Sequence, residues 1–209
     1  MTSKAYRVAC NYVLGLLDAE VDFALGLKKA IYYCQYKFTA EDYTDFINIP
    51  LIEAEKKHLN DWMSSILSDF KPPLDLIVLW FYLVCEVTSA NNYIIDFCFA
   101  GDSQKDKIGF NMCGPGIPEY LPANHLAHSP LLGFWAEKID KLPFESRFLS
   151  EYILGMTYAI LAARDLCKLY AADLGQEKKT VMAGFALGDG IIVGQVIDRY
   201  FYPQRNKSL

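Results

Sequence analysis

Several features common to membrane, secreted and nucleic-acid-binding proteins are missing from this chain of 209 residues. The longest apolar run, residues 76–85, has about half of the roughly 20 residues that a membrane-spanning helix needs. No apolar core follows the basic residues near the N-terminus, as it would in a secretory signal. A formal net charge of −5 lacks the basic surface that nucleic acids require. We therefore expect a cytoplasmic protein without a membrane or nucleic-acid partner.

The cysteines also lack the spacing of a metal or redox motif. The sequence contains six of them and no CxxC pair: Cys10, Cys34, Cys85, Cys98, Cys113 and Cys167. Most lie inside apolar segments, where free thiols behave as small apolar side chains. We interpret them as buried thiols in a reducing compartment, with a disulfide framework or a metal site as the alternative.

Motifs for nucleophilic catalysis and for phosphate binding are absent as well. The sequence has no GxSxG, and its glycine-rich region at 184–194 has no GxxxxGK[ST]. The GxGxxG pattern fails because Val193 stands where the third glycine belongs. We expect no cofactor. The candidates for chemistry are His125 and His128, as metal ligands or as ordinary loop residues, and Asp96, a carboxylate inside an apolar run.

Apolar residues are plentiful: 53% of the chain is hydrophobic and 14% aromatic. Three apolar runs, 76–85, 93–100 and 108–113, are separated by short polar breaks, which is typical of a β-meander. The first run is apolar at every position, so we expect a central strand that is covered on both faces. The runs at 180–187 and 191–197 flank a Gly-Asp-Gly turn and predict a hairpin. One apolar helix is the alternative there, at a cost of about 1 kcal/mol for each internal glycine.

Helical periodicity dominates the rest. Residues 5–36 predict one or two helices. The acidic residue three positions after Thr39 resembles a capping box and predicts a short helix there. Pro50 suits the first turn of a helix over 51–70. Its expected apolar side comprises Leu51, Ala54, His58, Trp62, Ile66 and Phe70. Residues 143–174 predict a long apolar helix across the sheet, 114–142 an irregular stretch with a short helix near 131–139, and 198–209 a frayed tail.

These elements predict a single α+β domain over residues 1–209. A helical part, 1–70, precedes a sheet over 76–197, which is an antiparallel meander plus a C-terminal hairpin covered by helices. Its acidic surface includes the cluster Glu41, Asp42 and Asp45 and the loop residues Asp102 and Asp106. We interpret these five residues as candidate contacts for a basic protein partner, which opposite charge would attract over a distance.

Part of the sequence resembles a known family. The segments LWFYL at 79–83, IDFCFAG at 95–101 and AGFALGDG at 183–190, with a long helix before the last, are similar to the layout of small bacterial immunity-type proteins of toxin–immunity systems. The resemblance covers about residues 76–197. It implies a binding protein that neutralises a toxin by direct contact. The run 108–113 departs from the family's acidic, tryptophan-containing third strand, and no site residue is carried over.

Three functions follow as hypotheses. The first is a non-enzymatic protein-binding protein of the immunity type. The second is an enzyme or metal-binding protein that uses the region around His125, His128 and Asp96. The third, suggested by the aromatic content, is a structural or assembly subunit. The sequence leaves the oligomeric state open.

Overall fold

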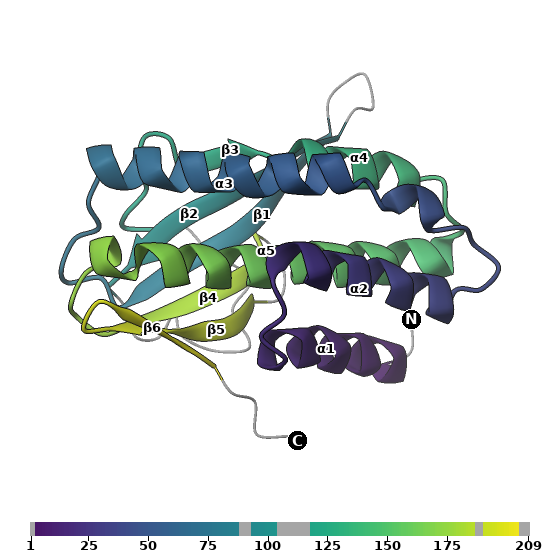
Figure 1. The fold of residues 1–209 in the computed structure, drawn as a ribbon, viewed down its shortest axis with the longest axis horizontal. Helices are drawn as coiled ribbons and strands as arrows, with labels where there is room; N and C mark the ends of the chain where they lie inside the picture. Colours follow the sequence, from purple (N-terminus) through teal and green to yellow (C-terminus); the bar gives the residue numbers. More distant parts are fainter. Residues whose placement is uncertain (1–2, 88–92, 104–117, 187–189, 205–209) are drawn as a thin grey trace.

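The computed structural model describes residues 3–87, 93–103, 118–186 and 190–204, which form a helical layer on a six-stranded sheet (Figure 1). The helices are α1 (Ser3–Asp18), α2 (Phe23–Lys37), η1 (Thr44–Phe46, a 3-10 turn), α3 (Ile49–Asp69), α4 (Pro130–Ile139) and α5 (Phe144–Leu174). The strands are β1 (Val78–Val87), β2 (Tyr93–Asp102), β3 (Leu126–His128), β4 (Lys179–Phe185), β5 (Gly190–Ile197) and β6 (Tyr200–Pro203). The expected α+β class is confirmed.

The sheet has the strand order β3-β2-β1-β4-β5-β6, so β1 lies in its interior as expected. All neighbouring strands are antiparallel except β1 and β4, which run parallel. A parallel pair needs a crossover connection, and the long helix α5 leads back to β4. The described sheet is therefore mostly antiparallel, with a parallel pair where β1 meets β4, the first strand of the C-terminal hairpin.

Strand β1 buries side chains on both of its faces, which confirms the expectation from its uninterrupted apolar run. Leu79, Phe81 and Leu83 belong to the main core, which also includes residues of every long helix. The alternate residues Val78, Trp80 and Tyr82 form a second, smaller cluster with Cys98, Ala100 and Met182. Successive side chains of a strand point to opposite faces, so one strand contributes to both clusters.

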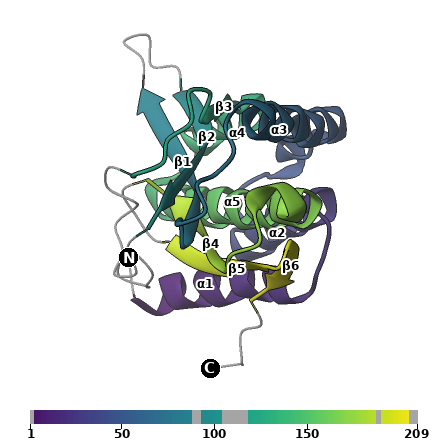
Figure 2. The same cartoon turned by 90° about the vertical axis from the view of Figure 1, so that its left-hand side faces the viewer.

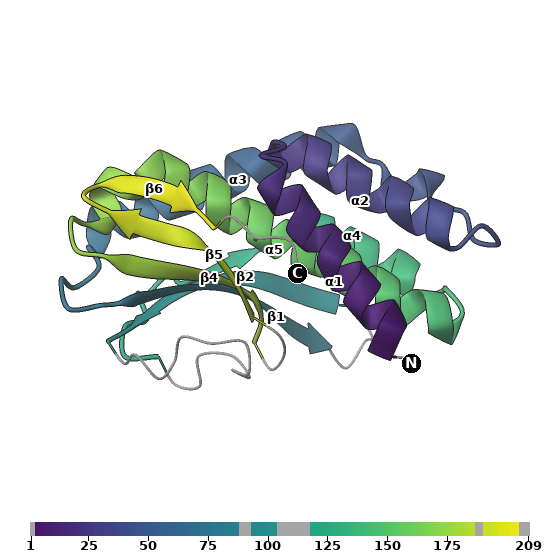
Figure 3. The same ribbon diagram turned by 90° about the horizontal axis from the view of Figure 1, so that it is seen from below.

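The helices lie together on one side of the sheet, with α5 next to the strands (Figures 2 and 3). Helix α5 contacts each of the other α-helices and the strands β1, β4, β5 and β6. All residues from Tyr152 to Arg164 are buried. A helix that is apolar all round is stable only when it is enclosed in this way.

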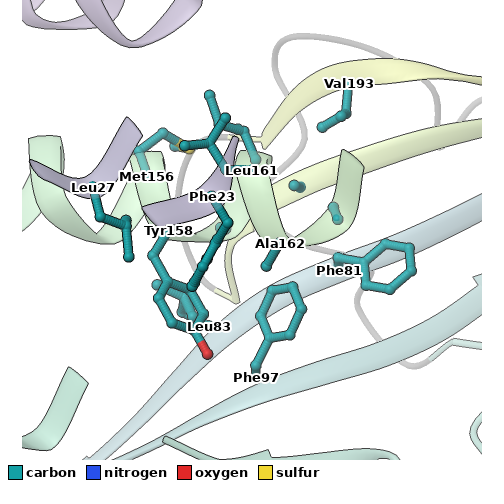
Figure 4. Packing of buried hydrophobic residues seen from close by; sticks show 14 of the residues in the cluster. Phe23, Leu27, Phe81, Leu83, Phe97, Met156, Tyr158, Leu161, Ala162 and Val193 are labelled. Atoms are coloured by element: carbon teal, nitrogen blue, oxygen red, sulfur yellow. The ribbon is translucent and has the colours of Figure 1, made fainter. Parts of the chain in front are cut away.

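Aromatic side chains fill the space between α5 and its neighbours (Figure 4). Tyr158 meets Phe97 of β2 and Phe23 of α2 edge to face, with ring centroids 5.6 and 5.4 Å away. On the α2 side, a β-carbon added at Gly26 would lie 2.2 Å from Cδ1 of Leu161. Gly26 is therefore the residue that lets α2 approach α5 closely.

Most helix boundaries agree with the sequence, and one does not. Asn48 caps α3 by accepting from the backbone N–H of Leu51, and Pro50 lies in the first turn as expected. The short helix predicted to begin at Thr39 is wrong. The Asp42 carboxylate accepts instead from the backbone N–H and the hydroxyl of Thr44, at 2.8 and 2.7 Å, and only the 3-10 turn η1 follows.

The buried side of α3 is also displaced from the expected one. Its buried residues are Ile52, Glu55, Leu59, Trp62, Met63, Ile66 and Leu67. Trp62 and Ile66 were expected there, but Ala54, His58 and Phe70 are exposed. The burial of Glu55, a charged residue, is explained by its partners from two other helices, α4 and α5.

The C-terminal hairpin of β4 and β5 is confirmed, whereas the frayed tail is wrong for residues 200–203. Strand β6 pairs with β5 through a two-residue turn, Asp198 and Arg199, whose φ angles are 52° and 70°. The stretch 114–142 contains α4 as expected, and also the strand β3, which pairs with β2. The third meander strand expected at 108–113 lies outside the described residues.

A buried carboxylate connects three of the helices. Glu55 of α3 accepts from the Tyr158 hydroxyl of α5 at 2.5 Å and from the backbone N–H of Leu131 in α4 at 3.3 Å. Burial, and then the charge of Glu55, raise the pKa of Tyr158 well above its ordinary value, so its hydroxyl stays a donor. The Leu131 N–H belongs to the first turn of α4, where a negative charge is stabilising.

We expect Tyr158→Phe to lower the free energy of unfolding by about 1–3 kcal/mol, because it removes one partner of a buried carboxylate. Tyr32→Phe removes the same hydroxyl from an exposed position and should change stability by less than about 0.5 kcal/mol. Urea denaturation of both variants measures the difference. Equal stabilities for the two would show that Glu55 does not depend on Tyr158.

Candidate functional site

A small pocket lies where α4 and the start of α5 meet the ends of β1 and β2. Its volume is about 110 Å³. The walls are largely apolar and are formed by Leu83, Ile95, Leu132, Trp135, Ala136, Ile139, Leu154, Gly155 and Phe185. Small-molecule sites usually measure roughly 300–1,000 Å³. This pocket therefore suits a single side chain or a ligand of a few atoms.

Two walls of the pocket are fixed by specific contacts. The indole N–H of Trp135 donates to the carbonyl oxygen of Phe46 at 3.0 Å, which ties α4 to η1. On the opposite wall, a β-carbon at Gly155 would lie 2.9 Å from Cζ of Phe185. The absence of a side chain at Gly155 therefore lets the Phe185 ring lie against α5 and close that wall.

The rim of the pocket is polar and contains one matched ion pair. Asp140 and Arg147 are 2.6 Å apart, and both side chains are about half-exposed. The hydroxyl of Tyr93 donates to the same carboxylate, and this hydrogen bond is the largest cause of the raised pKa of Tyr93. The negative charge of Asp140 is thus already matched by Arg147 and by a hydrogen-bond donor.

A second carboxylate at the rim, Glu151, is not matched in this way. Among the described residues it has no hydrogen bond and no ion pair. Burial, and then the charge of Glu151, raise the pKa of the neighbouring Cys85 thiol. A reactive cysteine needs a lowered pKa and a cationic neighbour, so Cys85 has the surroundings of an unreactive thiol.

The structure brings the predicted acidic cluster to the same end of the molecule. Figure 1 shows the connection between α2 and α3 beside the C-terminus of α4 and the start of α5. Asp45 lies 3.6 Å from Lys138, two residues before Asp140. Asp42 is fully exposed, and its hydrogen bonds with Thr44 lower its pKa. Asp45 therefore lies beside α4, which forms one wall of the pocket, and Glu41 and Asp42 belong to the same connection between α2 and α3.

The other two predicted contacts have different outcomes. The prediction that Asp102 lies in an exposed loop is wrong, because Asp102 belongs to β2 and is completely buried. Strand β2 continues two residues beyond the apolar run, and the carbonyl oxygen of Asp102 accepts from Ile77 at 2.9 Å. Asp106 lies outside the described residues.

The candidate metal ligands do not converge. Nδ1 of His125 is 2.8 Å from the carbonyl oxygen of Pro122, whereas Nδ1 of His128 is 3.3 Å from Asp96. Asp96 and His128 are cross-strand partners in β2 and β3, which explains their contact. In the described ranges, no group of three or more His, Cys, Asp or Glu side chains is placed to hold a metal ion.

A larger hollow, about 450 Å³, lies between α3 and α5 beside Phe23. Several of its polar groups already have structural partners. Asp165 accepts from the backbone N–H of Phe23 at 3.2 Å and pairs with Arg164 at 2.6 Å. Lys57 pairs with Asp61. Its lining also includes the apolar residues Leu59, Ala162 and Leu166 and the exposed residues Glu53 and Lys56.

Sequence reasoning missed this pocket because its walls come from five separate elements, β1, β2, α4, α5 and β4. One signal was visible: Glu151 directly precedes the most apolar part of the expected helix, residues 152–163. A charge at such a place either finds a partner in the fold or marks an exposed edge of the helix. The structure shows the second case.

No family model, no curated protein and no solved structure matches this chain. Within the described ranges, no helix has both the length and the apolar character needed to cross a bilayer.

The proximity of Glu151 and Cys85 has a measurable consequence. In Glu151→Gln the pKa of Cys85 should fall, because a neutral amide no longer disfavours the thiolate. More thiolate at pH 8 means faster alkylation of Cys85 by iodoacetamide, which peptide mass spectrometry measures at this residue. Glu145→Gln, an exposed change in the first turn of α5, should leave the rate unchanged. Equal rates in all three proteins would place Glu151 away from Cys85.

Proposed function

We propose that this protein is a non-enzymatic, cytoplasmic protein-binding protein that binds a basic protein partner at the end of its helical layer. In this proposal it acts as an immunity-type protein does, by covering a toxin through direct contact. One observation carries the proposal: an apolar pocket with an unmatched carboxylate, Glu151, lies at the same end of the molecule as the exposed acidic residues Asp42 and Asp45.

The charges at this end support a basic partner. Exposed carboxylates on one surface attract an oppositely charged protein and increase its rate of association. Of the cations at this end, Lys138 and Arg147 are paired with Asp45 and Asp140, whereas Lys37 and Lys141 are exposed and partly offset the negative charge. Glu41, Asp42 and Glu151 remain as negative charges without a described cationic partner. A net charge of −5 for the whole chain acts in the same direction.

Exposed aromatic side chains at the start of α5 support a protein partner in particular. Phe144 and Phe148 are 82% and 47% exposed, although the remainder of this helix is largely buried. Protein interfaces are enriched in aromatic residues and combine an apolar centre with a polar rim. The first turns of α5 and the pocket beside them have this composition.

The alternative of an enzyme or metal-binding protein depends on His125, His128 and Asp96. The two histidines have separate partners, and His128 is largely exposed. The geometry therefore favours the binding hypothesis over this one.

The proposal predicts that neutralising the acidic end slows association with the partner. The variant Glu41→Gln/Asp45→Asn/Glu151→Gln should bind a partner captured from the source cells with an association rate constant about tenfold lower at low salt. Surface plasmon resonance at two ionic strengths measures it, and the difference should shrink as salt rises.

A matched control carries three similar changes at exposed positions away from this end: Asp69→Asn/Asp173→Asn/Glu177→Gln. Its association rate constant should remain within twofold of the unmodified protein. Equal slowing in both variants would show a general charge effect and contradict a binding site at the acidic end, as would a partner whose binding neither variant changes.

A further inference from the structure

We propose that the pocket beside Glu151 is an anchor pocket, which takes one aliphatic side chain of the partner protein next to a lysine or arginine in the same segment. This inference rests on the proposed function and names the chemistry of the contact. Leucine or isoleucine is the expected anchor.

The dimensions of the pocket favour a single aliphatic group. A volume of about 110 Å³ matches one branched side chain and leaves little room for a fused aromatic ring or a nucleotide. Apolar walls from α4, α5, β1 and β2 would remove such a group from water. Residues that dominate binding energy in protein interfaces typically fill pockets of this kind.

The charges at the rim favour a cation beside the aliphatic group. The guanidinium of Arg147 is matched by Asp140 at 2.6 Å, so it offers little to an anionic ligand. Glu151 lines the same pocket and has no partner among the described residues. An ammonium or guanidinium group next to the anchor would complete the ion pair that Glu151 lacks.

The surrounding surface favours a polypeptide over a free small amine. The acidic residues Asp42 and Asp45 and the exposed rings of Phe144 and Phe148 lie at the same end of the molecule as the pocket. A free amine would reach only the pocket and its rim. A segment with basic residues on both sides of the anchor would contact both the pocket and the acidic cluster.

Capped peptides test this inference on the full-length protein without its partner. The probes are the N-acetylated, C-amidated tripeptides Lys-Leu-Lys, Lys-Gly-Lys and Glu-Leu-Glu, with isopentylamine as the free amine. Amide chemical shifts around Ala136, Glu151 and Gly155 report binding in NMR titrations. We expect Lys-Leu-Lys to bind at least about tenfold more tightly than Lys-Gly-Lys, because only the former buries an aliphatic side chain. Glu-Leu-Glu and isopentylamine should bind more weakly than Lys-Leu-Lys.

Two variants separate the apolar and ionic contributions. Ala136→Leu places extra carbon atoms in the pocket and should abolish the shifts caused by Lys-Leu-Lys. Glu151→Gln keeps the shape of the side chain and should weaken binding about twofold to fivefold, the range expected for an exposed ion pair. Glu137→Gln is an exposed change on α4 outside the pocket and should have no effect.

The inference is overturned if Lys-Gly-Lys or Glu-Leu-Glu binds as well as Lys-Leu-Lys, if isopentylamine binds more tightly than the peptide, or if no probe shifts these amides. These outcomes are distinct from failure of the proposed function. If a partner's association depends on the acidic end but no peptide shifts these amides, the proposed function stands and the anchor-pocket inference is wrong. Specific peptide binding without any protein partner would do the opposite.

Discussion

The burial of α5 on every side is the constraint on which the rest of the structure depends. A helix whose residues from Tyr152 to Arg164 are all buried must be enclosed by other elements, because so much apolar surface is unfavourable in water. The sheet encloses one side, and α1, α2, α3 and α4 enclose the others. The position of α5 before β4 also accounts for the one parallel strand pair, since it returns the chain to the end of the sheet where β1 begins.

Enclosing α5 has consequences for the polar groups inside the protein. The Glu55 carboxylate accepts hydrogen bonds from the Tyr158 hydroxyl of α5 and from the backbone N–H of Leu131 in the first turn of α4. The Asp165 carboxylate of α5 accepts a hydrogen bond from the first backbone N–H of α2, that of Phe23. Each of these carboxylates satisfies donors at a helix start that would otherwise be buried without a partner. The first turns of α5 escape this enclosure. There Phe144, Phe148 and Glu151 are exposed, and the pocket and the acidic cluster adjoin them, so the same helix that forms the core also presents the candidate surface.

Elements with a strong periodic pattern were predictable from the sequence. The continuous apolar run of β1, the long stripe of α5 and the Gly-Asp-Gly break between β4 and β5 each gave the correct type of element. The errors occurred where tertiary partners override local chemistry. Glu55 is charged and yet buried, and Asp102 was expected in an exposed loop but ends β2 in the interior. Asp42 accepts hydrogen bonds from Thr44, and a 3-10 turn forms there instead of the predicted short helix. Of the candidate site, the acidic cluster was predicted by charge, whereas the pocket required the spatial arrangement of five elements.

Native-state hydrogen exchange tests the central claim most directly, namely that the middle of α5 is the enclosed core of the fold and its start is free surface. The account predicts that amides from Tyr152 to Ala163 exchange only through global unfolding, with the free energy that urea denaturation gives for the whole protein. Amides from Glu145 to Phe148 should exchange through local opening at a much lower free energy. If amides in the middle of α5 instead exchange as readily as those at its start, the account is contradicted.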